Sequence, residues 1–261
     1  MNLSLSGKRA IVGGSTQGIG LAIARELASQ GASCTLLARN ENSLKEAVAS
    51  LDTNSGQQHE YLVADFHQSE QLKAIVEAYV KDHDVHILIN NSGGPASGPI
   101  TEAETTSFLA AFNQHLICNH ILTQAVIPSM KRSGYGRIIN VISTSVKIPL
   151  KNLGVSNTIR GAVASWAKTM ANELGAFQIT VNNVLPGATR TGRLSSLIEV
   201  MAQKQNTTTA QVETHMTEEI PMRRFADAEE IANVAAFLAS PAASYVNGVS
   251  IPVDGGRTGV I

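Results

Sequence analysis

Short apolar runs rich in β-branched residues alternate with longer segments of helical period along the whole chain. In the first helical segment Ile19, Ile23 and Leu27 lie four positions apart, which places them on one face. The pattern predicts strands at 9–14, 33–38, 61–65, 85–91, 137–143, 180–186 and 249–254. It predicts helices at 20–30, 41–51, 69–82, roughly 104–118 and 119–132, 154–174 and 227–240.

Continuous apolar strands separated by helices are typical of a parallel sheet that is covered on both faces. We therefore predict an α/β fold, with a doubly wound, Rossmann-like sheet of seven mostly parallel strands in a single domain, 1–261. A ligand should lie outside the carboxyl ends of the strands. Pro128 should end or bend its helix, and the threonines at 207–209 predict a helix start.

Composition narrows the function classes. Hydrophobic residues make up 43% of the chain and charged residues 16%, which excludes a disordered chain and allows a large core. Lys and Arg total 20 against 21 Asp and Glu, without a basic block that would bind nucleic acid. No apolar run approaches the ~18 residues that span a bilayer, and the N-terminus lacks a signal-peptide pattern. We expect a cytoplasmic protein without nucleic-acid or membrane partners.

The first predicted strand runs directly into a glycine-rich segment, GGSTQGIG, at residues 13–20. A pyrophosphate must approach backbone N–H groups closely there, and a Cβ would obstruct it or exclude the required dihedral angles. The helix N-terminus that follows adds free N–H donors and a positive dipole end. Because the same glycines also permit tight packing of strand and helix without a ligand, this segment alone leaves both interpretations open.

GGSTQGIG is similar to the glycine motif of the short-chain dehydrogenase/reductase family, with Gly13 in place of the usual threonine. The similarity covers essentially the whole chain, through NNSG (90–93), GRIINVIS (136–143), NNVLPGATRT (182–191), IPMRRFADAEEIANVAAFLAS (220–240) and VDGG (253–256). This resemblance implies a nicotinamide-dinucleotide site. Its residues would be Gly14, Thr16, Gln17, Gly18, Ile19, Gly20, Asn91, Gly93, Pro186, Gly187, Thr189 and Thr191.

Arg39, which directly follows the second predicted strand, bears on the choice of cofactor. In the family that this chain resembles, a basic residue directly after the second strand implies NADP(H) in preference to NAD(H), because arginine can hold a 2′-phosphate. Neither Leu37 nor Ala38 is acidic. The alternative is a solvated surface arginine. Asp65 resembles the family residue that contacts the adenine amino group, and is otherwise a helix cap or an Asx-turn residue.

The catalytic pattern of the family is interrupted. The resemblance implies an active-site serine, at Ser143, and then Tyr-x-x-x-Lys on one helix about thirteen residues later. Ser156 and Arg160 occupy those two positions. None of the four tyrosines is followed by lysine four residues later, so no shift of alignment restores the pair. The asparagine that completes the family's catalytic set corresponds to His115.

These replacements change the available chemistry. The aliphatic hydroxyl of Ser156 is a poor acid or base at neutral pH. Arg160 keeps a positive charge that could bind ribose hydroxyls of the cofactor, but guanidinium does not deprotonate in proteins and cannot relay protons. His115 titrates near neutrality and could carry protons if it faces the site, the alternative being a packed histidine.

Three functions remain open. The first is an NADP(H)-dependent oxidoreductase acting on a carbonyl or alcohol by a divergent mechanism, in which Ser143 orients the carbonyl and His115, Ser156 or an ordered water manages the proton. The others are a catalytically inactive NADP(H)-binding sensor or scaffold, and nonredox chemistry such as dehydration. No metal is expected.

The remaining expectations concern the periphery of the site and assembly. Residues 192–222, an insertion rich in Leu and Met, resemble the family's mobile substrate lid. The resemblance also implies a homodimer or homotetramer that associates through residues 104–132, 154–174 and 227–254. Cys34 and Cys118 are too few for a disulfide framework and are expected to be buried thiols.

Overall fold

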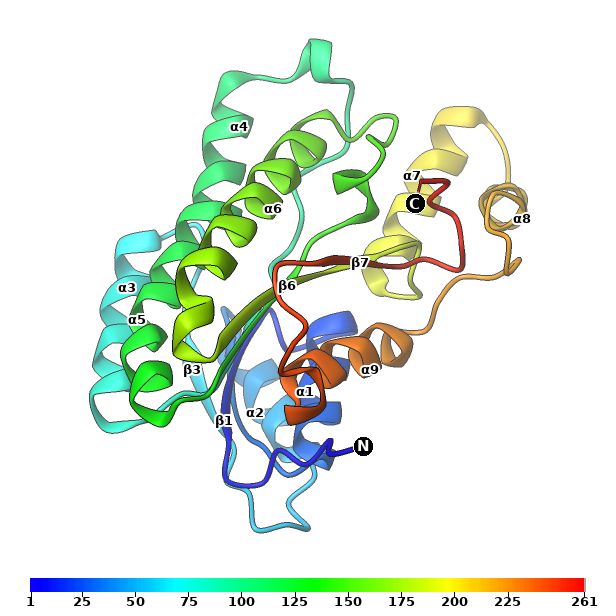
Figure 1. Ribbon diagram of the computed structural model, residues 1–261. Coiled ribbons are helices and arrows are strands. Elements are labelled where there is room, and N and C mark those ends of the chain that lie inside the picture. The colour runs from blue at the N-terminus through cyan, green and yellow to red at the C-terminus, as the bar shows by residue number, and fades with distance from the viewer. Residues whose placement is uncertain (261) are drawn as a thin grey trace.

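The computed structural model describes residues 1–260, and within them seven strands form one sheet (Figure 1). The sheet order is β3-β2-β1-β4-β5-β6-β7, and every neighbouring pair is parallel. The predicted doubly wound fold is confirmed, and these strands are wholly rather than mostly parallel. The strands are β1 (Arg9–Gly13), β2 (Ser33–Ala38), β3 (Glu60–Val63), β4 (Ile87–Asn90), β5 (Gly136–Val141), β6 (Ile179–Pro186) and β7 (Ser250–Val253).

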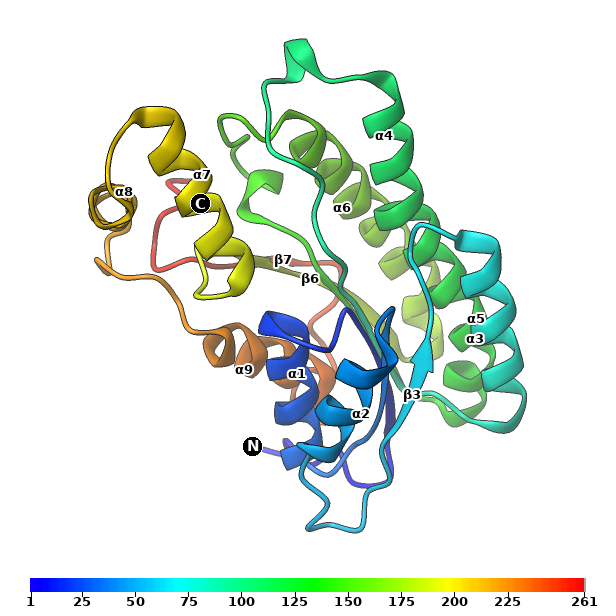
Figure 2. The same ribbon diagram turned by 180° about the vertical axis from the view of Figure 1, so that it is seen from behind.

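Helices cover both faces of the sheet, as Figures 1 and 2 show from opposite sides. The α-helices are α1 (Gly18–Ser29), α2 (Glu41–Ala49), α3 (Ser69–Asp82), α4 (Thr105–Phe112), α5 (Cys118–Ser133), α6 (Gly154–Leu174), α7 (Gly192–Gln205), α8 (Thr209–Glu218) and α9 (Ala228–Ala239). Short helical turns lie at η1 (Ile100–Glu102), η2 (Asn113–Ile117), η3 (Thr144–Val146), η4 (Gly175–Phe177) and η5 (Pro241–Ala243).

Successive side chains of each strand point to opposite faces of the sheet, so the hydrophobic core has two parts, one on each face. Ala10 and Val12 of β1 pack under α1, α2 and α9, whereas Ile11 points to the other face, which α3, α5 and α6 cover. This two-sided burial explains why the strands are apolar at nearly every position. The strand order reverses at β1, which pairs with β2 on one side and β4 on the other, so the ligand crevice of such a sheet is expected beside the carboxyl end of β1.

The segment predicted as two helices is continuous from α4 through η2 to α5, because the backbone of η2 is a π-helical turn rather than a break. Pro128 was predicted to end or bend its helix. It does not end it, since α5 continues to Ser133, and a bend stays a prediction. Pro128 cannot donate to the carbonyl of Gln124 one turn earlier. Both residues are exposed, so water can satisfy that carbonyl. The π-turn places His115 behind the crevice, and such turns are frequent at functional sites.

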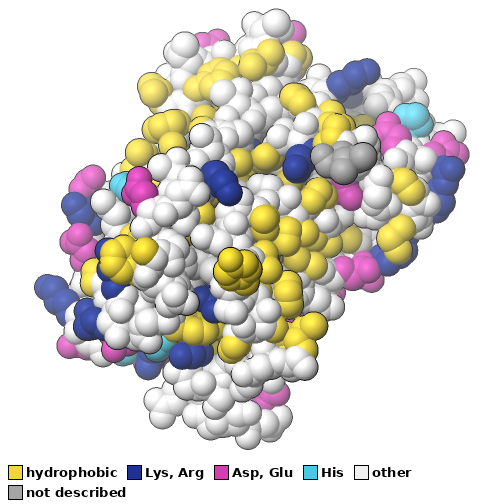
Figure 3. Space-filling model, in the orientation of Figure 1, with side chains coloured by type: hydrophobic (Ala, Val, Ile, Leu, Met, Phe, Trp, Pro, Cys, Tyr) yellow, Lys and Arg dark blue, Asp and Glu magenta, His cyan; other side chains and the backbone are white. Residues whose placement is uncertain are grey.

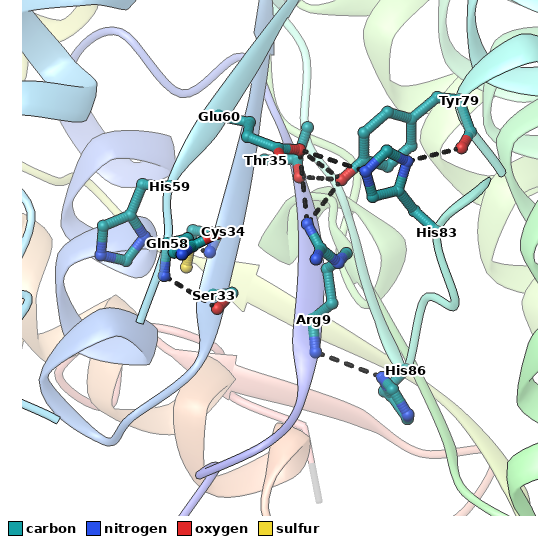
Figure 4. A network of polar contacts seen from close by, with 10 residues as sticks. All are labelled: Arg9, Ser33, Cys34, Thr35, Gln58, His59, Glu60, Tyr79, His83 and His86. Carbon is teal, nitrogen blue, oxygen red and sulfur yellow. Dashed lines mark hydrogen bonds and ion pairs between the residues drawn. The ribbon is translucent and has the colours of Figure 1, made fainter. Parts of the chain in front are cut away.

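A polar network occupies the opposite, amino-terminal end of the sheet (Figure 4). The hydroxyl of Tyr79 lies 2.6 Å from Thr35 Oγ1 and 3.0 Å from Glu60 Oε2, and Arg9 Nη1 lies 3.3 Å from the same carboxylate oxygen. The Tyr79 ring stacks on His83 with centroids 4.2 Å apart. The network joins β1, β2, β3 and α3. Tyr79, one of the four tyrosines, therefore has a structural role at this edge of the sheet.

The two cysteines lie in the core of the protein. Cys34 and Cys118 are fully buried free thiols, as predicted, and burial raises the pKa of each to about 12, so neither is a reactive thiolate at neutral pH. Across residues 1–260, none of the helices combines the length and apolar character that crossing a bilayer requires.

Candidate functional site

The glycine turn joins β1 to α1 at the carboxyl edge of the sheet. Gly14 and Gly18 have φ angles of +56° and +54°, a region that side chains with a Cβ rarely adopt. A Cβ at Gly20 would lie 2.2 Å from the Gly14 carbonyl oxygen, so this glycine allows helix and turn to touch. Gln17, the residue before α1, makes no side-chain capping bond, which leaves the first N–H groups of α1 available to an anion.

Neighbouring strands hold this turn in place. The buried Ser15 hydroxyl accepts a hydrogen bond from Leu37 N–H of β2 at 3.1 Å. Asn91, which directly follows β4, donates through Nδ2 to the carbonyl oxygens of Gly13 and Gly14 at 3.1 and 3.2 Å. The turn is therefore preorganised before any ligand binds, which reduces the entropy that a ligand must offset.

A buried row of amides supports the same edge of the sheet from within. Asn90 Nδ2 donates to Asn140 Oδ1 at 2.9 Å, Asn140 Nδ2 donates to Asn183 Oδ1 at 2.9 Å, and Asn183 Nδ2 donates to Ser250 Oγ at 3.0 Å. These residues face one another in the register of β4, β5, β6 and β7. The row fixes the four strands one residue before Asn91, and so aligns the strand ends that carry the site.

Two adjacent cavities, which share several wall residues, lie along this edge. The first, which we call the glycine-turn cleft, has a volume of about 350 Å³ and runs past Arg39 and Asp65. The second, the Ser143 cavity, measures about 290 Å³. Ile19, Asn91 and Thr191 line both. Each residue predicted to bind the cofactor lines at least one of them: Gly14, Thr16, Gln17, Gly18, Ile19, Gly20, Arg39, Asp65, Asn91, Gly93, Arg160, Pro186, Gly187, Thr189 and Thr191.

Arg39 and Asp65 are two charged residues that line the glycine-turn cleft. Arg39 is exposed at the end of β2 and, among the described residues, has no ion-pair or hydrogen-bond partner. Asp65 Oδ1 accepts from the His67 N–H at 3.0 Å and lies 2.9 Å from His67 Nδ1, so the Asx-turn interpretation describes its geometry. Contact of Asp65 with an adenine amino group stays a prediction.

Ser143 and Arg160 meet in the second cavity. Ser143 lies two residues after the end of β5 and directly before η3. Its Oγ accepts from Ser145 N–H at 3.1 Å, which leaves its own proton free to donate into the cavity. Arg160 projects from α6, and its Nη1 donates to the Val141 carbonyl at 3.1 Å. Burial, followed by the positive charge of Arg193, lowers the pKa of Arg160 to about 10, so the guanidinium remains charged at neutral pH.

The other two predicted catalytic residues do not reach the cavity. Ser156 is buried in the first turn of α6 and lines neither cavity, because its side chain is far shorter than the tyrosine of the family pattern. His115 is 1% exposed and also lines neither. Burial, and after it the positive charges of Arg160 and Arg193, lower the pKa of His115 to about 2. The prediction that His115 carries protons is therefore corrected: it is a neutral, packed histidine near pH 7.

Several residues of the cavity walls, among them Ser92, Arg193 and Arg257, were not singled out from the sequence. Ser92 lines both cavities, and its Oγ lies 2.8 Å from His115 Nδ1, so His115 positions this hydroxyl. Arg193 and Arg257 also line the Ser143 cavity. Ser92 stands inside the NNSG motif and could have been noticed there. The two arginines carry no local signal, since they reach the cavity from α7 and from the segment after β7.

The expected lid segment, 192–222, contains α7 and α8, joined by a turn that Thr208 caps as predicted. It has a small core of its own, in which Ile198 and Val212 pack together. Leu194, Leu197 and Met216 face the Ser143 cavity. The segment thus supplies an apolar wall, and its mobility stays a prediction.

Comparison with known proteins agrees with this geometry. A family model described as Enoyl-(Acyl carrier protein) reductase matches residues 14–258. The 7alpha-hydroxysteroid dehydrogenase of Escherichia coli is 33% identical over 258 residues, covering 98% of this chain and 96% of that protein. The NADPH-dependent reductase BacG of Bacillus subtilis is 29% identical over 254 residues, covering 97% of this chain and 98% of that protein.

A solved structure gives the same result in three dimensions. The L-sorbose reductase of Gluconobacter frateurii, complexed with NADPH and L-sorbose, superposes with a TM-score of 0.93 at 30% identity and full coverage of both chains. The matched region includes the glycine turn, the strand ends and both cavities. This chain belongs to the short-chain dehydrogenase/reductase family of NAD(P)-dependent oxidoreductases, which act on CH–OH and C=O groups.

Proposed function

We propose that this protein is an NADP(H)-dependent oxidoreductase that acts on the carbonyl or alcohol group of a small molecule without the tyrosine–lysine pair of its family. The observation that carries the proposal is that two adjacent cavities share wall residues, one beside the glycine turn and Arg39 and the other beside Ser143. NADP(H), when bound, supplies or accepts the hydride. A purely non-catalytic sensor is disfavoured by the family membership and by the open cavity beside Ser143.

The chain's own groups then have separate roles. The N–H groups at the start of α1 and the glycine turn bind the pyrophosphate, and Arg39 binds the 2′-phosphate. Ser143 donates a hydrogen bond to the substrate oxygen. Arg160 lines the same cavity and supplies it with a fixed positive charge. Because Ser156 and His115 do not reach the cavity, the proton comes from a water molecule held there.

The reaction is tested by following NADPH oxidation with a panel of ketones and aldehydes. Ser143→Ala should reduce kcat/KM by roughly 10²-fold, the usual effect of removing one donor to a developing oxyanion, with unchanged NADPH affinity. Ser165→Ala, an exposed change on α6, is the control. Saturable NADPH binding with no turnover across the panel would contradict the proposal and support the sensor.

Cofactor preference is tested at Arg39. Arg39→Gln should weaken NADPH binding roughly ten- to hundredfold, the loss of one charge-assisted contact, and leave NADH binding within about twofold. Fluorescence titration of both reduced cofactors measures this, with Arg25→Gln as a control on the exposed side of α1. Equal or tighter binding of NADH by the unmodified protein would show that Arg39 is only a surface residue.

The proposal includes a homodimer or homotetramer, and a cytoplasmic location. Figure 3 shows hydrophobic side chains gathered over the edge strand β7 and near the outer end of α4. Val249 and Tyr245 are 37% and 101% exposed beside β7, and Leu109 of α4 is 70% exposed. Large exposed apolar residues at an unpaired sheet edge favour burial by a second copy. Light scattering that reports a monomer would contradict the assembly.

A further inference from the structure

Two guanidinium groups converge in the Ser143 cavity without a negative partner. A Cβ built on Gly94 would lie 2.9 Å from Arg193 Nη2 and 3.6 Å from Arg160 Nη2, so both groups reach the same point. Arg193 donates to the carbonyl oxygens of Gly94 and Pro95 at 2.9 and 3.0 Å, and Arg160 donates to Val141. Their partners in the described residues are therefore neutral carbonyl groups.

No acidic side chain of residues 1–260 lines this cavity to compensate the two charges. A third arginine, Arg257, is neutralised, because its Nη2 lies 2.6 Å from Glu219 Oε2. Arg160 is buried whereas Arg193 is exposed, so the loss of solvation falls on Arg160 and the mutual repulsion on both. An anion between them would relieve both effects. The arrangement is therefore complementary to a negatively charged ligand.

The cofactor phosphates do not account for both charges. In the proposed function the glycine turn and Arg39, which line the glycine-turn cleft, bind the cofactor phosphates. Arg160 lines the Ser143 cavity but not the glycine-turn cleft. Arg193 lines both cavities and stands at their junction. A ligand that pairs with both arginines at once must therefore extend into the space beside Ser143, where the substrate is expected.

We propose that the substrate is a carbonyl compound that carries a carboxylate, which Arg160 and Arg193 bind together. This inference rests on the proposed function. The two oxygens of a carboxylate can each accept from one of these guanidinium groups. The third arginine of the cavity, Arg257, is paired with Glu219, so no free cation remains there for the third oxygen of a phosphate. Leu150, Leu194 and Leu197 line the same cavity, so the rest of the substrate is small and apolar.

Ligand binding tests the proposal independently of turnover. Isothermal calorimetry on the protein saturated with NADP⁺ compares 4-methyl-2-oxopentanoate with its methyl ester, and acetoacetate with methyl acetoacetate. The carboxylates should bind at least tenfold tighter, because each ester leaves the two guanidinium groups without an anion. The carboxylate affinity should also fall as salt rises, while the ester affinity should not.

Substitution of the arginines assigns the preference to this pair. Arg160→Met and Arg193→Met should each reduce the preference for carboxylate below about threefold, and Arg160→Lys should retain part of it, because the charge remains. Arg223→Met is the matched control, since Arg223 also donates to a backbone carbonyl, that of Glu218, but lines neither cavity. NADPH titration and thermal unfolding of each variant show that it is folded.

Each outcome has one meaning. Equal binding of acid and ester, no detectable binding of either acid, or a preference that survives both methionine variants would overturn the carboxylate site. Arg160→Met and Arg193→Met could instead lose NADPH affinity while they keep the preference for carboxylate over ester. That result would assign the two charges to the cofactor and would also overturn the carboxylate site. Carboxylate binding without NADPH oxidation would instead overturn the proposed function and leave the anion site standing.

Discussion

Gly20→Ala should abolish NADPH binding and lower the free energy of unfolding by about 3 kcal/mol, the upper end of the usual cost of overpacking. The added Cβ would lie 2.2 Å from the Gly14 carbonyl oxygen and 2.7 Å from Asn91 Nδ2. Neither neighbour can yield, because Gly14 is backbone and the Asn91 amide holds the turn through two hydrogen bonds. The helix must shift away, and the N–H groups that would bind the pyrophosphate shift with it.

Urea unfolding and fluorescence titration with NADPH measure the two effects. Gly161→Ala is the matched control, because Gly161 is also helical and a Cβ there meets nothing within 4 Å. That change should stabilise the protein by roughly 0.4–1 kcal/mol, because alanine lowers the conformational entropy of the unfolded chain and has a higher helix propensity than glycine. If Gly20→Ala binds NADPH as the unmodified protein does, the glycine turn is not the phosphate site.

Asn140→Ala should destabilise the fold by roughly 3 kcal/mol, since it removes the centre of the buried amide row. The substitution leaves Asn90 Nδ2 and Asn183 Oδ1 without their partners in a region that water does not reach. For a chain of this length the melting temperature should fall by roughly 6–12 °C. Asn172→Ala, at an exposed position on α6, should change it little. A loss below about 1 kcal/mol would mean that the row aligns the strands without stabilising them.

The elements themselves were largely predictable, because each depends on local patterns. The α3 and α6 helices match their predicted ranges, 69–82 and 154–174, since apolar periodicity is a property of neighbouring residues. Strand limits were less accurate: the predicted strand 85–91 is shortened to Ile87–Asn90. Strand ends depend on which partner residues lie opposite, and β4 must register with β1 and β5 at once.

Catalytic residues were harder to predict than the cofactor site. The predicted phosphate site is a contiguous stretch of backbone, so its residues could be named from the glycine spacing together with the family resemblance. His115 and Ser156 were selected by their distance along the chain from known motifs, and such a count says nothing about burial. His115 occupies the expected position, yet its surroundings keep it neutral and away from the cavity. Its partner Ser92 lies between Asn91 and Gly93 in the sequence, but only the structure shows the hydrogen bond that joins Ser92 to His115.

The sequence by itself determined the parallel sheet, the dinucleotide-binding turn and the loss of the tyrosine–lysine pair, because all three are matters of residue type and short spacing. Only the tertiary structure decided which polar side chains share the cavity. Arg160 and Arg193 are on different helices, α6 and α7, and the fold brings their guanidinium groups together beside Gly94. Burial and convergence of charge arise from the packing of distant segments, which no local pattern records.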